Sequence, residues 1–192
     1  SANNYEAAAY LISNGADVNY SSIDGRTPLT AWVEGNPVNF ETGEMLLKEG
    51  ADINAKAVDG TTPFTSAFMK ALGTNDTKLL EFLIENGADV NEQLFTSSDV
   101  GLSALHIAAE SDNDYLARML IKNGADIEIK NSDGETPLVL AAKSESASAV
   151  SLLIKIGADL DAKDKNGRKV IDILASSDNH AMKVFINQNI SK

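Results

Sequence analysis

Residues 101–128 read GLSALHIAAESDNDYLARMLIKNGADIE, and this stretch decides the fold. Apolar residues gather in 105–109 and then recur in 116–121 at the spacing of one helix face. A polar turn separates the two runs, and Gly124 follows the second run, where helices end in left-handed dihedral angles. The stretch predicts two short helices joined by a tight turn. Because such a pair cannot bury its apolar faces alone, we expect further helices on both sides of it.

The end of this stretch recurs along the chain. The glycines of its Gly-Ala-Asp motif are residues 15, 50, 87, 124 and 157. A period near 33, made of a turn and two helices, is typical of ankyrin repeats. The chain resembles that family over nearly its full length. The matching runs are GRTPL at 25–29, GTTPF at 60–64, LHIAA at 105–109 and GETPL at 134–138.

The resemblance implies an all-α repeat solenoid, in which helix-turn-helix units are joined by β-hairpin-like fingers. We expect one ankyrin domain over residues 1–192. Its predicted parts are a half repeat at 1–19, repeats at 20–54, 55–91, 92–128 and 129–161, and a C-terminal capping repeat at 162–192. Residues 5–13 correspond to the second helix of a repeat whose first helix is missing, so we expect a fragment of a longer chain.

Composition and charge exclude several classes of function. The net charge is −12, and residues 1–47 contain one basic residue against six acidic ones. An acidic chain repels phosphate, so we expect neither a nucleic acid nor an anionic membrane as partner. The charge serves solubility or steers a basic partner to the chain. The absence of cysteine excludes disulfides and thiolate chemistry, and no apolar run is long enough to cross a membrane.

Some repeats depart from the regular length. Extra residues are expected near 35–37, near 72–77 and within 92–100. The last insertion brings Leu94 and Phe95 to a finger tip, where they form a contact patch or fold back onto the neighbouring repeat. Trp32 occupies a position where the family has a small alanine, and we expect it in the core. The sixth repeat lacks both Thr-Pro-Leu and Gly-Ala-Asp, which suits a cap facing water.

No constellation of side chains indicates catalysis. His106 fills the histidine position of the family's Thr-Pro-Leu-His motif, which implies a structural hydrogen bond, and His180 has no partner motif. The Asp of each Gly-Ala-Asp motif is expected to accept hydrogen bonds from backbone in the adjoining finger. Asp159, Asp161 and Asp164 only approach the spacing of a calcium loop. We therefore expect no enzyme activity, no cofactor and no metal.

A binding function remains, because stacked repeats present a long surface. The resemblance implies a partner protein or peptide on the concave and finger surface, which the finger tips and the inward face of the first helices form, with apolar anchors and a polar rim. We expect a monomer inside the cell. The candidate residues are Ile23, Arg26, Glu34, Val58, Thr61, Met69, Lys70, Leu94, Phe95, Leu102, Glu110, Ser132, Glu135, Lys143, Lys165 and Arg168.

Two other hypotheses stay open. The array could be the targeting or regulatory part of a larger enzyme, or of a bacterial effector delivered into a host cell. Asn19, Asn54 and Asn91 also follow the pattern that asparaginyl hydroxylases recognise in ankyrin repeats. Structural hydrogen bonding is the expected explanation for these three asparagines.

Overall fold

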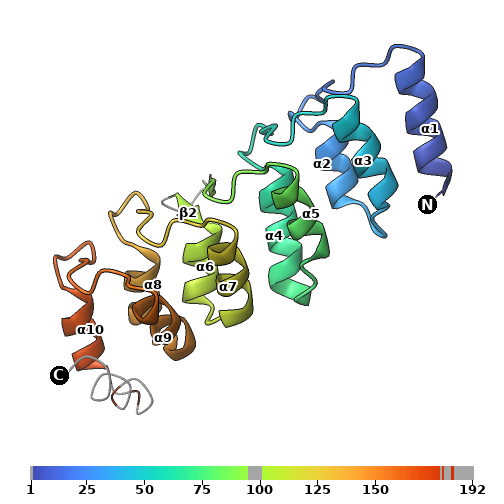
Figure 1. Ribbon diagram of the computed structural model, residues 1–192. Helices are drawn as coiled ribbons and strands as arrows, with labels where there is room; N and C mark the ends of the chain where they lie inside the picture. The colour runs from blue at the N-terminus through green and yellow to red at the C-terminus, as the bar shows by residue number, and fades with distance from the viewer. Residues whose placement is uncertain (1, 95–100, 178, 180–182, 184–192) are drawn as a thin grey trace. The chain divides into compact units, whose positions relative to one another are not determined.

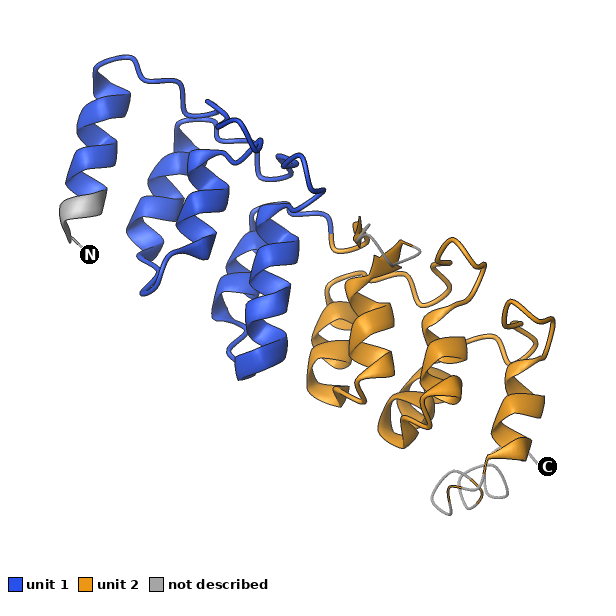
Figure 2. Cartoon of the chain, turned by 180° about the vertical axis from the view of Figure 1, so that it is seen from behind, with its two compact units in different colours: residues 1–89 blue, residues 90–192 orange. Residues whose placement is uncertain are grey.

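The structure is a computed structural model that describes residues 2–94, 101–177, 179 and 183. Helix pairs alternate with extended segments along the chain (Figure 1). The chain divides into two compact units, residues 1–89 (unit 1) and residues 90–192 (unit 2), which are coloured separately in Figure 2. The predicted all-α repeat array is therefore confirmed.

Unit 1 contains one single helix and two helix pairs. The first helices of its pairs, α2 and α4, pack on each other, and the second helix α3 packs on α1. This arrangement repeats one contact pattern from pair to pair. The helices are α1 (Ala2–Ser13), α2 (Pro28–Glu34), α3 (Phe40–Lys48), α4 (Pro63–Thr74) and α5 (Lys78–Glu85).

Unit 2 repeats the pattern. The first helices α6, α8 and α10 pack in series, and the second helices α7 and α9 pack on each other. Its two short strands pair antiparallel, with Gln93 opposite Ser103 and Leu94 opposite Leu102. The elements are β1 (Gln93–Leu94), β2 (Leu102–Ser103), α6 (Ala104–Glu110), α7 (Asp114–Lys122), α8 (Pro137–Lys143), α9 (Ala147–Lys155) and α10 (Val170–Ser176).

Each of the first helices α2 and α4 begins directly after a threonine that caps its N-terminus. The Thr27 side chain accepts a hydrogen bond from the Thr30 backbone N–H, and the Thr30 hydroxyl oxygen in turn accepts one from the Thr27 N–H. Such a reciprocal cap satisfies donors that a helix start leaves unpaired. Pro28 occupies the first helical position, where its missing N–H costs nothing. Both α2 and α4 therefore begin directly after the threonine of their Thr-Pro pair.

The second helices end at the Gly-Ala-Asp motifs. Gly124 has φ of +92°, and the Ala125 N–H donates to the Leu120 carbonyl at 3.0 Å, so the last turn of α7 closes on itself. The Asp126 carboxylate then accepts from the N–H of Glu128 at 2.9 Å. The aspartate thus binds backbone two residues ahead, where the next finger begins.

Asparagine side chains join one repeat to the next. The Asn19 amide donates to the Gly50 carbonyl at 2.9 Å and accepts from the Asp52 N–H at 2.8 Å. Asn91 makes the same two bonds to Gly124 and Asp126 in unit 2. The expected structural role of these asparagines is confirmed, and their hydroxylation stays a prediction.

Trp32 lies in the core of unit 1, as predicted. Its ring is 8% exposed, its indole N–H donates to the Asn39 carbonyl at 2.6 Å, and it packs edge-on against the rings of Phe40 and Phe82. Gly43 of the facing helix leaves room for it, since a Cβ there would lie 2.4 Å from the indole ring. The glycine in α3 therefore makes room for the large side chain of Trp32 in α2.

The insertions expected in the third and fourth repeats differ in structure. Those of the third repeat lengthen α4 to 12 residues, against seven in α2, α6 and α8. Leu94 is half-buried in the β1–β2 pair. Phe95 and the rest of 95–100 lie outside the described residues, as do His180 and almost all of the predicted last helix.

Candidate functional site

Two neighbouring fingers of unit 1 expose apolar side chains. Ile23 is 104% exposed and Val58 is 80% exposed. The Val58 N–H donates to the Asp24 carbonyl at 2.9 Å, so the two finger tips are joined through their backbones. Gly25 permits this approach, because a Cβ there would lie 2.8 Å from the Val58 nitrogen. The apolar pair is therefore held in place.

A charged cluster adjoins this pair. Arg26 forms ion pairs with Asp24 and with Glu34, the latter at 3.0 Å, and its guanidinium lies 3.8 Å from the Asp59 carboxylate of the next finger. The Ser22 hydroxyl and the Arg26 guanidinium lower the pKa of Asp24 to about 2. The cluster thus contains three carboxylates, those of Asp24, Glu34 and Asp59, and one cation, the Arg26 guanidinium. Asp24 and Asp59 are absent from the sequence-predicted set, because an aspartate directly before a glycine is typical of a turn.

The other candidates of unit 1 divide into exposed and engaged side chains. Met69 is 53% exposed and occupies in α4 the place that Glu34 occupies in α2. Thr61 is half-buried, and its N–H donates to the Asp59 carboxylate. The Lys70 ammonium donates to the Val33 and Gly35 carbonyls at 2.6 and 2.9 Å. Lys70 therefore caps the C-terminal end of α2, and its part in binding a partner stays a prediction.

We define the finger surface as the exposed side chains that these fingers and first helices bring together. Its members are Ile23, Asp24, Arg26, Glu34, Val58, Asp59 and Met69.

In unit 2, the structure corrects the expectation that Glu135 is available on the partner-binding surface. The side chain is 2% exposed, and its carboxylate accepts from the Lys143 ammonium at 2.8 and 3.0 Å and from the Lys165 N–H at 3.1 Å. Its backbone carbonyl also meets the His106 ring at 3.0 Å. Glu135 thus ties together three successive repeats, so we leave it out of any partner surface.

The remaining candidates of unit 2 are mostly polar and locally paired. Arg168 pairs with the buried carboxylate of Asp164 at 2.8 Å, and the Lys165 ammonium lies 3.7 Å from Asp133. Leu102 is half-buried, whereas Ser132 and Glu110 are exposed. In the described part of unit 2, no two neighbouring fingers expose large apolar side chains as Ile23 and Val58 are exposed in unit 1.

His106 is structural, as expected. The Ser103 N–H donates to Nδ1 at 3.1 Å, so the proton of the neutral ring is on Nε2, which donates to the Glu135 carbonyl. The ring is fully buried, and this burial lowers the pKa of His106 although the Glu135 carbonyl opposes the shift. With both ring nitrogens engaged, His106 has no atom free to act as a base.

The carboxylates do not gather into a metal site in the part of the chain that the structure describes. Asp164 binds Arg168, Asp161 binds Lys169, and Asp159 accepts from the Asp161 N–H. Within the same residues, no helix is both long enough and apolar enough to cross a membrane.

A family model described as ankyrin repeats (3 copies) matches residues 1–94, 39–131 and 105–192. The chain belongs to the ankyrin repeat family. Ankyrin repeats generally serve as protein–protein interaction modules, and the family is typically non-enzymatic. Comparison with curated proteins gives no match. The prediction that this ankyrin array targets or regulates a larger enzyme or a bacterial effector stays a prediction.

Proposed function

We propose that the ankyrin chain binds a partner protein or peptide through the finger surface of unit 1. The observation that carries the proposal is the exposed pair of Ile23 and Val58, on fingers joined by a backbone hydrogen bond. Single exposed apolar residues are ordinary on protein surfaces, but a fixed pair beside a charged cluster has the composition of a binding site.

The chemistry of the surface indicates the partner's side chains. The apolar pair offers an anchor that loses water on binding, and Met69 adds a flexible thioether side chain that adapts to different shapes. The Arg26 cluster has more carboxylates than cations, so a partner with lysine or arginine at the rim is favoured. The partner we expect is therefore an apolar segment with basic flanks.

The test selects peptides against the whole chain from a random displayed library and then measures the affinity of the selected peptides. The double variant Ile23→Ser/Val58→Ser should weaken binding about 30-fold or more, because two anchors are lost. The matched control is Tyr115→Ser/Ile156→Ser, which removes exposed apolar side chains from α7 and the end of α9. Equal losses in both double variants would contradict the proposal.

A further inference from the structure

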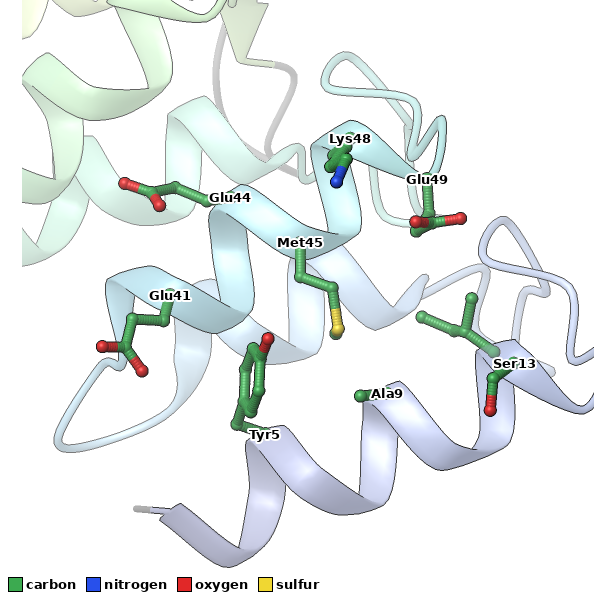
Figure 3. Close-up of a pocket in the computed structure, with 9 residues that line it drawn as sticks. Tyr5, Ala9, Ser13, Glu41, Glu44, Met45, Lys48 and Glu49 are labelled. Atoms are coloured by element: carbon green, nitrogen blue, oxygen red, sulfur yellow. The ribbon is translucent and has the colours of Figure 1, made fainter.

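A groove of about 700 Å³ lies between α1 and α3 in unit 1. Its floor is apolar: Figure 3 shows Tyr5 and Ala9 pointing from α1 towards α3, and Met45 pointing from α3 towards α1. Ile12 completes the floor. All four side chains are half-buried, so they keep apolar area in contact with water.

The neighbouring junction between second helices shows what this groove lacks. Counted back from the Gly-Ala-Asp glycines, Tyr5 corresponds to Phe40, and Met45 corresponds to Phe82. Between α3 and α5, the Phe40 and Phe82 rings meet edge to face, with centroids 5.4 Å apart, and Trp32 packs on both. Between α1 and α3 the same two positions leave the groove open. One large apolar side chain from outside would supply the missing contact.

The rim of the groove is acidic. Glu41, Glu44 and Glu49 border it together with one cation, Lys48. Among the residues that the structure describes, none of these three carboxylates forms an ion pair. An incoming segment with lysine or arginine beside its apolar side chain would meet unpaired negative charge, and the excess of acidic side chains throughout unit 1 would attract it.

The walls determine the backbone shape of the occupant. Both walls are helices, whose backbone groups already bond within each helix, so an extended segment would find no free strand edge. A helix satisfies its own backbone and presents only side chains. The lining residues run from Tyr5 to Ser13 and from Glu41 to Glu49, a length of about 12 Å at 1.5 Å per residue. This length accommodates about two turns of a helix.

We infer that the groove between α1 and α3 is a second docking site, which takes the apolar face of a basic amphipathic helix from a partner protein. The groove lies between second helices, whereas the finger surface lies on fingers and first helices. The inference therefore does not rest on the proposed function.

The test uses the whole chain and a synthetic helical peptide of about 14 residues, built of leucine on one face and lysine on the other. The control peptide has glutamate in place of lysine. Labelled peptide gives the dissociation constant by fluorescence anisotropy, and backbone amide shifts show where it binds. We expect binding of the lysine peptide alone, with amide shifts in α1 and α3.

Two variants and a matched control make the test specific. Ala9→Trp fills the groove, and Glu41→Lys places at the rim the residue that α5 has at the same position, Lys78. Each should weaken binding about tenfold or more. Glu85→Lys makes the same charge change on α5, where α3 has Lys48, and should change binding by no more than about twofold.

Three results would overturn the inference. The lysine peptide could fail to bind, or Glu85→Lys could weaken binding as much as Glu41→Lys, which would mean unspecific charge attraction. The amide shifts could also fall only on the finger surface, in which case the proposed function stands and the groove site fails. If Ala9→Trp lowers the helix content measured by circular dichroism, Glu41→Lys and the milder Glu41→Gln decide the question.

Discussion

At the scale of single residues, different side chains at the third position of the first helices make the same capping hydrogen bond. The side chains of Thr30, Thr65 and His106 each accept a hydrogen bond from the backbone N–H of the capping residue three positions earlier. In α8 this position is Val139, and Thr136 is left with a buried hydroxyl that has no partner in the described part of the chain. The family pattern marks the position, but only the individual side chain decides whether the cap forms.

The pH dependence of stability should report His106. Burial lowers its pKa in the folded chain, so below about pH 6.5 the unfolded chain binds a proton that the folded chain does not. The free energy of unfolding should therefore be highest above pH 6.5 and fall as the pH drops towards the folded pKa, with a slope of at most about 1.4 kcal/mol per pH unit.

Urea unfolding between pH 7.5 and pH 5.5 measures this slope. His106→Gln should flatten the curve, and because His180 is present in both proteins the difference isolates His106. A curve of equal slope in the variant would show that another group is responsible.

Val139→Thr should stabilise the chain. The new hydroxyl can pair with Thr136 as Thr30 pairs with Thr27, and one added hydrogen bond contributes about 0.5 to 1.5 kcal/mol. Urea unfolding gives the change in free energy. As a control, Thr136→Val removes the unpaired hydroxyl and should be close to neutral. A loss of about 1 kcal/mol in Val139→Thr would mean that its hydroxyl is also left unpaired.

At the scale of elements, the repeats differ in how their helices meet. The turns that follow α4, α6 and α8 each contain a left-handed residue, Asn75, Asp112 or Glu145, whereas Gly35 after α2 has φ of −59°. Asp112 also accepts from the Ala149 N–H at 2.9 Å, so a turn of one repeat caps helix α9 of the next. This forward contact makes the start of α9 depend on the preceding repeat, which couples these two helix pairs within unit 2.

The contact of α2 with α3 predicts an unusual effect of Gly43→Ala. Alanine normally stabilises a helix interior by about 1 kcal/mol relative to glycine. Here the added Cβ would lie 2.4 Å from the Trp32 ring, so we expect a loss of about 1 to 3 kcal/mol instead.

Chemical denaturation of four proteins checks this effect: the original chain, Gly43→Ala, Trp32→Ala and the double variant. In the double variant the two substitutions should compensate in part, because alanine no longer meets the ring. Strict additivity of the two losses would contradict the account.

At the scale of the whole molecule, charge is distributed unevenly. The chain has 28 acidic against 16 basic side chains. Residues 1–89 contain thirteen acidic and five basic side chains, whereas residues 90–192 contain fifteen and eleven. The finger surface and the groove both lie in the unit with the greater negative excess. Self-repulsion of this kind opposes the compact state and favours basic partners.

Salt should therefore stabilise the chain. Raising NaCl from about 10 mM to about 300 mM shortens the screening length and should raise the midpoint of thermal unfolding by a few degrees at pH 7. The exposed ion pairs oppose this change, but each contributes little. Equal shifts in KCl would exclude specific ion binding. A midpoint that falls with salt would show that favourable pairs outweigh repulsion.

The sequence alone determined the repeat, the starts and ends of its helices and the structural role of His106. These features depend on interactions over a few residues, such as caps, glycine ends and apolar spacing, which the chain encodes locally. The finger candidates Ile23 and Val58 were also predictable, since fingers face water wherever the repeat forms, and so was the exposure of Met69 near the end of the first helix α4. Their part in binding stays a prediction.

Only the tertiary structure decided that Glu135 is buried, that Lys70 caps α2, and that a groove opens between α1 and α3. Lys70 and Val33 are 37 residues apart, and Glu135 and Lys165 are 30 apart. A repeat pattern gives such residues equivalent positions but does not say which side chains reach across to the next repeat. That outcome depends on side-chain size and charge on both sides of each junction, because packing, unlike helix capping, is decided jointly by segments distant in the chain.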